Sequence, residues 1–462
     1  MPKLALPKGR LLAGTMSLVE GLGLEGYAPG SRSYRLESSR YPGLWAKVFQ
    51  ERDIPIQVAV GNYDLGICGL DWVEELLAKF PSSDLVKVRQ LGYGRGELWV
   101  AASRRLGISS VEGLKLWQGP LRLASEYPNT AEALALRLRL RRFLVYPLWG
   151  AAEVYPPENA DLVIVPGEDI DGELVPLARL GSTEAVLIAN KRSWGSRDLA
   201  EVLRAMGESS EVEAPESEPP GEPKRGAGSP AETEAGPDRV WLALPDGHQQ
   251  RPAAQFLERA GFPISGYSES QCLRRPGTDW EGLSIKVIRP QDMPLQVAAG
   301  NFDLALTGRD WLHDHLARFP ASPVAELLNL GFGWVRLVAV VAESMPAHNI
   351  SELRRLMNSG NLPRLRIASE YAHLADKYAW DNHLSPYRLI PTWGASEAFL
   401  PEDADLLIEN TQTGRTLAEH KLRVIDTLFE STACLVGNRH SLSHPAKAKT
   451  IGRIVACLQG AL

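Results

Sequence analysis

The sequence predicts an α/β protein with mainly parallel sheets, built as two tandem copies of a two-lobed unit joined by a disordered linker. Three observations predict this class. Short apolar runs alternate with segments of helical period, a set of motifs occurs twice in the same order, and a stretch with few large apolar residues separates the two occurrences. Open sheets of this kind bind ligands at the ends of their strands.

The repeated motifs keep their order along the chain. "LALPKG" at Leu4 returns as "LALPDG" at Leu242, and "QVAVGNYDLGICGLDW" at Gln57 returns as "QVAAGNFDLALTGRDW" at Gln296. The later pairs are "LAKFPSS" with "LARFPAS", "LGYG" with "LGFG", "ASEY" with "ASEY", and "WGAAE" with "WGASE". A conserved order with a slowly drifting offset indicates a tandem duplication.

The expected boundaries follow from composition. Residues 207–239 are rich in Glu, Pro, Ser and Gly, so they bury too little surface to offset the entropy of ordering and are predicted to be a disordered linker. The halves are then 1–206 and 240–462, and new strands ("LWVAA", "RLVAVVA") start a second lobe within each. The first half divides into lobe I, about 1–95 and 185–206, and lobe II, about 96–184; the second divides into lobe I, about 240–334 and 433–462, and lobe II, about 335–432.

Local patterns predict the first elements. "KLAL" is expected as a strand, and "LLAGTMSLVEGL" as a helix with Leu12, Met16 and Val19 on one face. "IQVAV" and "DLGICG" are expected as further strands, and "WVEELLAKF" as the helix that follows. We expect a ligand-binding cleft between the two lobes of each half.

Composition excludes several classes of function. The net charge of −6 indicates no overall basic surface for nucleic acid. The four cysteines lie far apart, without the paired spacing of a zinc site or the density of a disulfide framework. No apolar run approaches the 18 or more residues of a membrane helix, and the N-terminus lacks the pattern of a signal peptide. We therefore expect a cytoplasmic protein that binds neither nucleic acid nor membrane and carries no protein-bound metal.

A loop in the second half has the composition of an anion site. "ENTQTGRTL", from Glu409 to Leu417, directly follows the apolar run "DADLLI". Gly414 can take a positive φ, so that successive N–H groups curl together, while neighbouring threonines offer hydroxyls. A Thr/Gly-rich turn at a strand end is also common as a plain turn. The loop alone leaves both interpretations open.

Taken together, the motifs resemble the catalytic region of ATP phosphoribosyltransferase, the first enzyme of histidine biosynthesis. The resemblance is carried by "LALPKGRLL", "ERDIPIQVAVGNYDLGICGLD", "LGYG", "ASEYPN", "WGAAE" and "TGRTL", and it covers nearly all of both halves. It implies two-lobed units of the type II periplasmic-binding-protein kind. It also implies transfer of the phosphoribosyl group of phosphoribosyl pyrophosphate to N1 of ATP, with Mg²⁺ and release of pyrophosphate. A histidyl-tRNA-synthetase-like regulatory subunit and a homo-oligomer are possible partners.

The same resemblance assigns the second half's loop to the 5′-phosphate of the ribosyl donor. The substrate-binding residues that it implies there are Glu409, Thr411, Gln412, Thr413, Gly414, Arg415 and Thr416. The family usually has an aspartate and a glutamate where this chain has Glu409 and Gln412. Those carboxylates are expected to hold ribose hydroxyls, so the change bears on donor affinity and rate.

Each half has lost a different feature. At the loop's counterpart the first half reads "VPGEDIDGEL", whose carboxylates, Glu168, Asp169, Asp171 and Glu173, would repel a phosphate. In the second half Asp246, His248 and Gln291 stand opposite Lys8, Arg10 and Arg52, and the segment 268–271 stands opposite Arg32, so we expect the basic cluster to be lost there. We therefore predict one composite site. The first half would supply Lys8 for binding and Arg10, Arg32 and Arg52 for catalysis, and the second half would supply the phosphate loop.

Simpler roles remain open for these residues. Lys8 and Arg10 are also explained as solvated loop charges, and Arg52 as an ion pair with Asp53. Residues that occur in both halves are expected to be scaffold, turn or helix-capping residues: Glu153 and Glu397, Asp64 and Asp303, Asp71 and Asp310. For the whole chain, the alternative function is that of a non-catalytic nucleotide-sensing or regulatory paralogue, or of a structural partner, that activates a separate catalytic chain.

Overall fold

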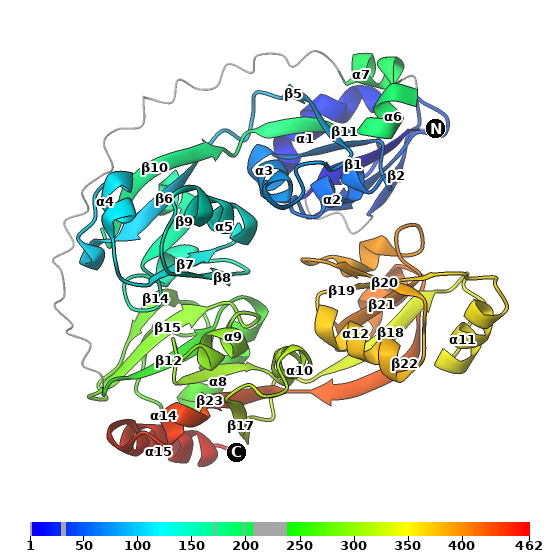
Figure 1. Ribbon diagram of the computed structural model, residues 1–462. Coiled ribbons are helices and arrows are strands. Elements are labelled where there is room, and N and C mark those ends of the chain that lie inside the picture. The colour runs from blue at the N-terminus through cyan, green and yellow to red at the C-terminus, as the bar shows by residue number, and fades with distance from the viewer. Residues whose placement is uncertain (1, 29–33, 171, 197–198, 207–237) are drawn as a thin grey trace. The chain divides into compact units, whose positions relative to one another are not determined.

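The computed structural model describes residues 2–28, 34–170, 172–196, 199–206 and 238–462 (Figure 1). Arg32, Asp171 and linker residues 207–237 lie outside this part, so their expected roles are not addressed by the structure. Each half contains two sheets of five or six strands with helices packed on them, so the chain is an α/β protein with two tandem copies of one two-lobed unit.

The first lobe of the first half is built on a six-stranded sheet with the order β2-β3-β1-β4-β11-β5. Strand β1 runs parallel to β3 and β4, whereas β11 returns antiparallel between β4 and β5. The strands are β1 Lys3–Pro7, β2 Arg35–Glu37, β3 Trp45–Phe49, β4 Leu65–Gly69, β5 Leu85–Gln90 and β11 Ala185–Asn190. The helices are α1 Leu12–Val19, α2 Ile54–Ala59, α3 Leu70–Lys79, α6 Lys191–Ser196 and α7 Ala200–Ala205.

The second lobe of the first half has five strands in the order β10-β6-β9-β7-β8. They are β6 Glu97–Ser103, β7 Leu121–Ser125, β8 Phe143–Pro147, β9 Leu162–Pro166 and β10 Leu174–Ser182, with helices α4 Val111–Leu116 and α5 Pro128–Arg137. The chain passes between the lobes twice, from β5 to β6 and from β10 to β11. Two short connections of this kind form a hinge.

The second half repeats the strand order of the second lobe, and it repeats that of the first lobe without the edge strand β2. Its first sheet is β15-β12-β16-β23-β17 and its second is β20-β19-β21-β18-β22, with a separate hairpin of β13 and β14. The first-lobe strands are β12 Val240–Pro245, β13 Ser265–Tyr267, β14 Cys272–Gly277, β15 Leu283–Ile288, β16 Leu304–Gly308, β17 Val324–Asn329 and β23 Ala433–Asn438. The second-lobe strands are β18 Val335–Ala342, β19 Leu365–Ser369, β20 Tyr387–Pro391, β21 Leu406–Thr411 and β22 Leu422–Ser431.

The helices of the second half follow the same plan. The first lobe carries α8 Gln250–Arg259, α9 Met293–Ala298, α10 Arg309–Arg318, α14 Arg439–Leu442 and α15 Pro445–Gln459, and the second lobe carries α11 Ile350–Asn358, α12 Ala372–Asp381 and α13 Arg415–Glu419. Both halves therefore have the two-lobed plan expected of a type II periplasmic-binding-protein-like unit.

One local prediction is wrong. The run "IQVAV" lies in helix α2 and not in a strand. Pro55 stands in the first turn of this helix, where its missing N–H costs nothing and its fixed φ favours helix formation. A short apolar run has no periodicity that distinguishes a strand from a buried helix, and here the proline decides.

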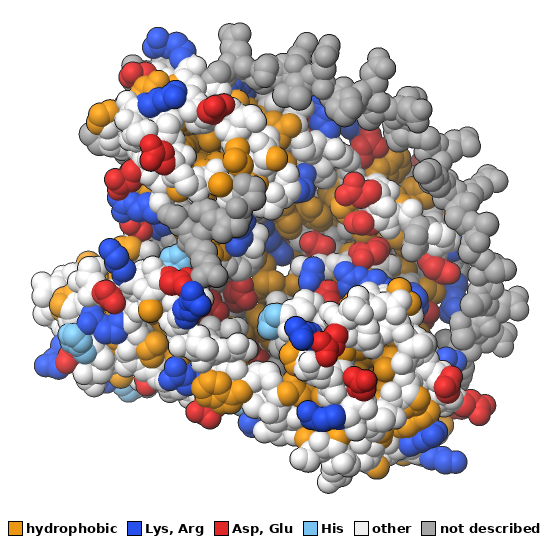
Figure 2. Space-filling view, turned by 180° about the vertical axis from the view of Figure 1, so that it is seen from behind, with side chains coloured by type: hydrophobic (Ala, Val, Ile, Leu, Met, Phe, Trp, Pro, Cys, Tyr) orange, Lys and Arg blue, Asp and Glu red, His pale blue; other side chains and the backbone are white. Residues whose placement is uncertain are grey.

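Each lobe has its own hydrophobic core. Leu4, Leu65 and Leu187 lie on adjacent strands of the first sheet and are fully buried, and Leu242, Leu304 and Leu435 occupy the matching strands of the second half. Each such side chain contributes roughly 1.5–3 kcal/mol by leaving water. Within the described residues, no helix has the length and apolar character needed to cross a membrane. Side chains of both charges are interspersed over the face seen in Figure 2.

Two short segments group with the opposite half. The compact unit built on the first half includes Trp393–Ala398, and the unit built on the second half includes Trp149–Val154. These are the repeated "WGASE" and "WGAAE" motifs. In the first unit Tyr34 Oη donates to Glu397 Oε1 at 3.2 Å. In the second, the Trp149 N–H donates to the carboxylate of Asp292 at 3.0 and 3.2 Å.

Candidate phosphoribosyl-transfer site

The threonine-rich loop lies between strand β21 and helix α13. Gly414 has φ +74°, in the left-handed region that favours glycine, and it stands at the N-cap position of α13. Its N–H donates to Thr411 Oγ1 at 3.0 Å, and the N–H of Arg415 donates to Thr413 Oγ1 at 3.4 Å. Thr413 and Thr416 are exposed, so their hydroxyls are accessible to a ligand. The geometry is that of an exposed anion-binding loop.

Two of the other predicted loop residues, Arg415 and Glu409, form hydrogen bonds within the protein. The Arg415 Nε atom pairs with Glu419 Oε1 at 2.9 Å on the same helix, and its side chain is otherwise exposed. Glu409 Oε1 accepts the N–H of Asn410 at 2.9 Å, while Gln412 is exposed. The structure thus brings the predicted loop residues together at one strand end.

The counterpart loop of the first half has the opposite electrostatic character. Strand β9 leads into a turn at Gly167–Asp169. Glu168, Asp169 and Glu173 are exposed around it. Carboxylates at this density repel a phosphate, because like charges oppose each other at short range.

Arg10 is bound within the protein. Its Nη1 atom donates to the carbonyl oxygens of Gly94 at 3.2 Å and Thr183 at 2.9 Å, in the two segments that join the lobes. Its Nη2 atom lies 3.0 Å from Glu51 Oε2 and 3.3 Å from Asp71 Oδ1. Two carboxylates and two carbonyls engage this guanidinium, so the geometry assigns Arg10 to the hinge.

Glu51 gives this hinge contact a pH dependence. The pKa of its carboxyl is raised from 4.5 to about 7, mainly by burial; Arg10 lowers it and the nearby Asp71 raises it, and both effects are included in this value. A carboxyl with a raised pKa stabilises the fold in its protonated form, so this contribution is present below pH 4.5 and is lost as the pH rises through about 7.

Glu51→Gln is expected to remove that dependence. Between pH 4.5 and 7 the free energy of unfolding of the unmodified protein should fall relative to the variant, by at most about 1.4 kcal/mol per pH unit. Urea unfolding of both proteins across this range measures the difference. Parallel pH profiles would show that Glu51 titrates normally.

Arg52 lies among aromatic rings. Its Cζ atom is 5.2 Å from the centroid of the Trp72 ring and 4.2 Å from that of Trp393, both within the first compact unit. Burial lowers the pKa of the guanidinium, whereas the negative charges of Glu75 and Glu126 raise it. An arginine side chain remains charged even when it is buried, so Arg52 supplies a permanent positive charge. Cation–π contacts hold this charge in surroundings that contain little water.

Lys8 and Arg32 complete the predicted basic set. The Lys8 Nζ atom lies 5.7 Å from the centroid of the Tyr34 ring, and the Lys8 N–H donates to the carbonyl of Phe49 at 2.9 Å. Lys8 follows β1 and Arg52 follows β3, so both lie at the carboxyl ends of neighbouring parallel strands. Arg32 falls outside the described residues.

The loss of the basic residues opposite Lys8, Arg10 and Arg52 stays a prediction, but two other arginines of the second half lie beside Asp246. Arg274 Nη1 lies 2.8 Å and Arg289 Nη1 lies 3.2 Å from Asp246 Oδ2. With the halves aligned through Leu44 and Leu283, Arg274 stands opposite Arg35 and Arg289 opposite Gln50, so neither is a counterpart of Lys8, Arg10 or Arg52. Asp246 replaces Lys8 and is an internal counterion for the pair, so the second half keeps arginines but offsets part of their charge.

The expected capping role of Asp71 and Asp310 is also wrong. Helices α3 and α10 have no side-chain cap, and the two carboxylates instead accept hydrogen bonds from Tyr127 Oη at 2.6 Å and Tyr371 Oη at 2.7 Å. Each tyrosine belongs to the other lobe of its half. The repeated Asp–Tyr pair therefore joins the lobes. This role can be recognised only in the tertiary structure.

The other repeated carboxylates contact residues far away in the sequence. Asp64 and Asp303 accept the backbone N–H of Lys3 and Trp241 at 2.9 and 2.8 Å, so each holds the first strand of its half. Glu153 lies 3.9 Å from Arg274 within the second unit.

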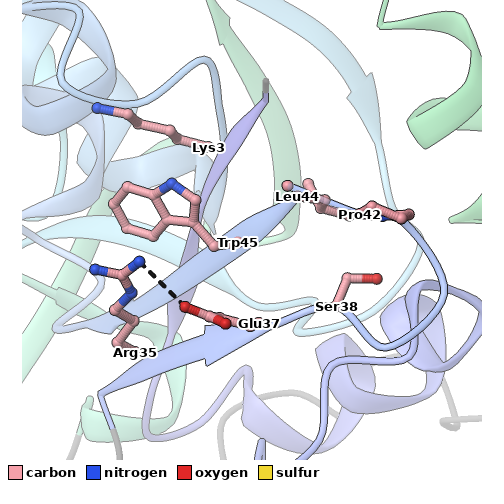
Figure 3. A pocket seen from close by; sticks show the side chains of 8 residues that line it. Lys3, Arg35, Glu37, Ser38, Pro42, Leu44 and Trp45 are labelled. Carbon is pink, nitrogen blue, oxygen red and sulfur yellow. Dashed lines mark hydrogen bonds and ion pairs between the residues drawn. The ribbon is translucent and has the colours of Figure 1, made fainter.

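A pocket of about 720 Å³ lies away from this region, at the amino ends of β1 and β3 (Figure 3). The ring of Trp45 lies between Lys3 and Arg35, with the cations 5.4 and 5.0 Å from its centroid. Lys8 and Arg52 follow the opposite ends of the same strands. The pocket is therefore separate from the candidate site.

Comparisons with known proteins agree with the repeated architecture. The family model for HisG, ATP phosphoribosyltransferase, matches residues 50–208 and again residues 289–460. The ATP phosphoribosyltransferase of Prosthecochloris aestuarii is 33% identical over 226 residues, which cover 48% of this chain and 71% of the relative. That of Sulfolobus acidocaldarius is 32% identical over 225 residues, covering 48% and 72%.

Solved structures match at lower similarity. An ATP phosphoribosyl transferase (HisG:HisZ) complex from Thermotoga maritima covers 48% of this chain and 98% of its own, with 20% identity and a TM-score of 0.39. The periplasmic aliphatic sulphonate binding protein SsuA from Escherichia coli covers 49% and 69%, with 15% identity and a TM-score of 0.30. The two family-model matches together span more than half of the chain, and the chain belongs to the HisG family of ATP phosphoribosyltransferases.

Proposed function

We propose that this chain is an ATP phosphoribosyltransferase with one composite site. It would transfer the phosphoribosyl group of phosphoribosyl pyrophosphate to N1 of ATP and release pyrophosphate. The observation that carries the proposal is complementarity. The second half keeps an exposed loop with Gly414 at φ +74°, whereas the first half places exposed carboxylates at the same strand end and keeps Lys8 and Arg52 at another.

The chemistry requires no covalent nucleophile. Transfer at the ribose C1′ passes through an oxocarbenium-like state, so catalysis consists of placing the adenine N1 and stabilising the leaving pyrophosphate. In this proposal the loop from Thr411 to Thr416 holds the 5′-phosphate of the donor. Arg52 stabilises the charge that develops on the pyrophosphate, and its partly dry aromatic setting strengthens that interaction.

The proposed site contains fewer of the basic residues than the sequence predicts. Arg10 contacts four protein oxygens at the hinge, so we assign it to positioning of the lobes. Lys8 stays in the proposal as a binding residue. Arg274 and Arg289 are a second source of positive charge, offset by Asp246.

Mg²⁺ is proposed to enter with the substrates. Among the residues that the structure describes, no three His, Cys, Asp or Glu side chains are grouped to hold a metal ion. Magnesium often binds through substrate phosphates with few protein ligands, which fits this residue set. Bound to the diphosphate, it would neutralise negative charge on the leaving group.

The partners follow from the family and are proposals for this chain. The substrates would be ATP and phosphoribosyl pyrophosphate, in the cytoplasm. A histidyl-tRNA-synthetase-like regulatory subunit and self-association are further candidates, and size-exclusion chromatography with light scattering tests the second.

A sensing function is the second candidate. Glu409 and Gln412 depart from the family pattern at the ribose, and Arg10 is committed to the hinge. The first feature bears on donor affinity and rate, and the second leaves less positive charge for the leaving pyrophosphate. In this case the chain would bind nucleotide and activate a separate catalytic chain.

Steady-state assay of the purified full-length chain separates the two functions. We expect phosphoribosyl-ATP to form from ATP and phosphoribosyl pyrophosphate in the presence of Mg²⁺. Calorimetry under the same conditions reports binding independently of turnover. Binding of the donor without product would contradict catalysis and favour the sensing function.

A further inference from the structure

Asn410, directly before the phosphate loop, belongs to a chain of side chains that crosses between the lobes of the second half. Its Nδ2 atom donates to Tyr371 Oη at 2.7 Å, and Tyr371 Oη donates to Asp310 Oδ2 at 2.7 Å. Asp310 Oδ1 accepts from Ser431 Oγ at 3.2 Å, and the Asp310 N–H donates to the same Oγ at 2.9 Å. The Tyr371 hydroxyl thus accepts a hydrogen bond from an amide and donates one to a carboxylate, as a neutral tyrosine can.

The two central residues of this hydrogen-bonded series, Tyr371 and Asp310, are tightly packed. Tyr371 is fully buried and Asp310 is 3% exposed. The Tyr371 ring stacks on Trp311, with centroids 4.3 Å apart. Burial, with Asp310 and Glu409 nearby, raises the pKa of Tyr371 well above its usual value, so the hydroxyl keeps its proton. Each member is therefore held in one orientation by packing as well as by hydrogen bonds.

The two ends of the hydrogen-bonded series lie at the hinge between the lobes and beside the phosphate loop. Ser431 is the last residue of β22, where the chain passes back to the first lobe. Asn410 lies in β21 next to Thr411, whose Oγ1 accepts the N–H of Gly414 at 3.0 Å. Hydrogen bonds thus run from Ser431 at the hinge to Asn410, which is covalently joined to Thr411, the residue whose hydroxyl shapes the loop.

The first half offers a natural comparison. It keeps the same tyrosine and carboxylate, with Tyr127 Oη donating to Asp71 Oδ2 at 2.6 Å. Aligning "ADLVIVP" with "ADLLIEN" places Pro166 opposite Asn410, and proline has no side-chain donor. The amide link therefore accompanies the threonine-rich loop and is missing beside the acidic one.

We propose that Asn410 and Tyr371 are positioning residues that, through Asp310, fix the phosphate loop relative to the first lobe of the second half. The inference deepens the proposed function, on which it rests, by assigning these residues to donor binding. Neither residue contacts the reacting atoms. Their effect is to hold the loop in the binding geometry before the donor arrives, which lowers the ordering cost of binding.

Two variants and a matched control test this assignment in the full chain. Asn410→Leu and Tyr371→Phe should each weaken binding of phosphoribosyl pyrophosphate, measured by calorimetry, by about tenfold, as expected for loss of one buried hydrogen bond. The KM for ATP should stay unchanged. Tyr127→Phe, which removes the matching hydroxyl in the first half, should leave donor affinity unchanged. Equal losses from Tyr127→Phe and Tyr371→Phe would overturn the proposal.

The double variant shows whether the residues act as a unit. Asn410→Leu combined with Tyr371→Phe should weaken donor binding by about the same factor as Tyr371→Phe alone, because either change breaks the same link. A loss equal to the product of the single losses would contradict the relay.

Hydrogen exchange separates failure of this inference from failure of the proposed function. Without any substrate, the Gly414 amide in the full chain should exchange about tenfold faster in Asn410→Leu than in the unmodified protein. If the unmodified protein binds no donor, the proposed function fails, and faster exchange at Gly414 still supports the positioning role. Unchanged exchange at Gly414 overturns that role.

Discussion

Gly414→Val is expected to abolish binding of phosphoribosyl pyrophosphate while the protein stays folded. Gly414 has φ +74°, which a β-branched residue adopts only at a cost of about 1–3 kcal/mol. An added Cβ would meet no atom of the described residues within 4 Å, so the expected effect is a changed loop conformation and not a clash. Calorimetry with the donor measures the loss.

Gly300→Val is the matched control for this change. Gly300 has φ +76° and equally open surroundings in the same half, but it follows α9, away from the phosphate loop. It should cost similar stability and leave donor affinity intact. A folded Gly414→Val protein with unchanged affinity would remove the loop from the candidate site.

Arg52→Ala is expected to lower kcat about a hundredfold, a loss of roughly 3 kcal/mol, and to change donor affinity much less. The reason is that the charge on the leaving pyrophosphate develops in the transition state, where a fixed guanidinium among Trp72 and Trp393 has most effect. Steady-state kinetics with both substrates separates the two parameters.

Gln291→Ala tests the same position in the second half. Gln291 aligns with Arg52, and its Oε1 atom is buried without a hydrogen-bond partner among the residues that the structure describes. We expect kcat to change little, since a neutral amide supplies no charge. Similar losses from Arg52→Ala and Gln291→Ala would mean that the difference between the halves has no catalytic role.

The architecture follows largely from sequence because duplication and alternation are repeated signals. The motifs "LALPKG" and "LALPDG" mark β1 and β12, and the apolar runs before the two loops mark β9 and β21. Helix α2 was missed because its six residues are too few to show a helical period. Only Pro55 signalled a helix start there.

The site was predicted less completely, since its contacts join residues far apart in sequence. The loop from Thr411 to Thr416 is contiguous and could be found from composition. The engagement of Arg10 by Gly94 and Thr183 depends on two hinge segments that meet only in the folded lobes. A motif comparison registers Arg10 as a free charge, whereas the fold makes it a hinge contact.

The second half's arginines illustrate a different limit. Arg274 lies on β14 and Arg289 follows β15, and no motif links them, yet both reach Asp246. Comparing the halves at Lys8, Arg10 and Arg52 does not reveal a charge supplied from other positions, and the pairing of these arginines with Asp246 appears only in the fold. Likewise, Asn410 reads as one polar residue in a loop until Tyr371 is placed beside it.

Reconstitution from separate halves tests the composite site most directly. Residues 1–206 and 240–462, purified separately, would be assayed for phosphoribosyl-ATP formation alone and as a mixture of increasing concentration. The account predicts that neither fragment is active alone and that the mixture recovers activity as concentration rises, because one fragment lacks the phosphate loop and the other lacks Lys8 and Arg52. Substantial activity from 240–462 alone would contradict it, and would assign the charge to Arg274 and Arg289 instead.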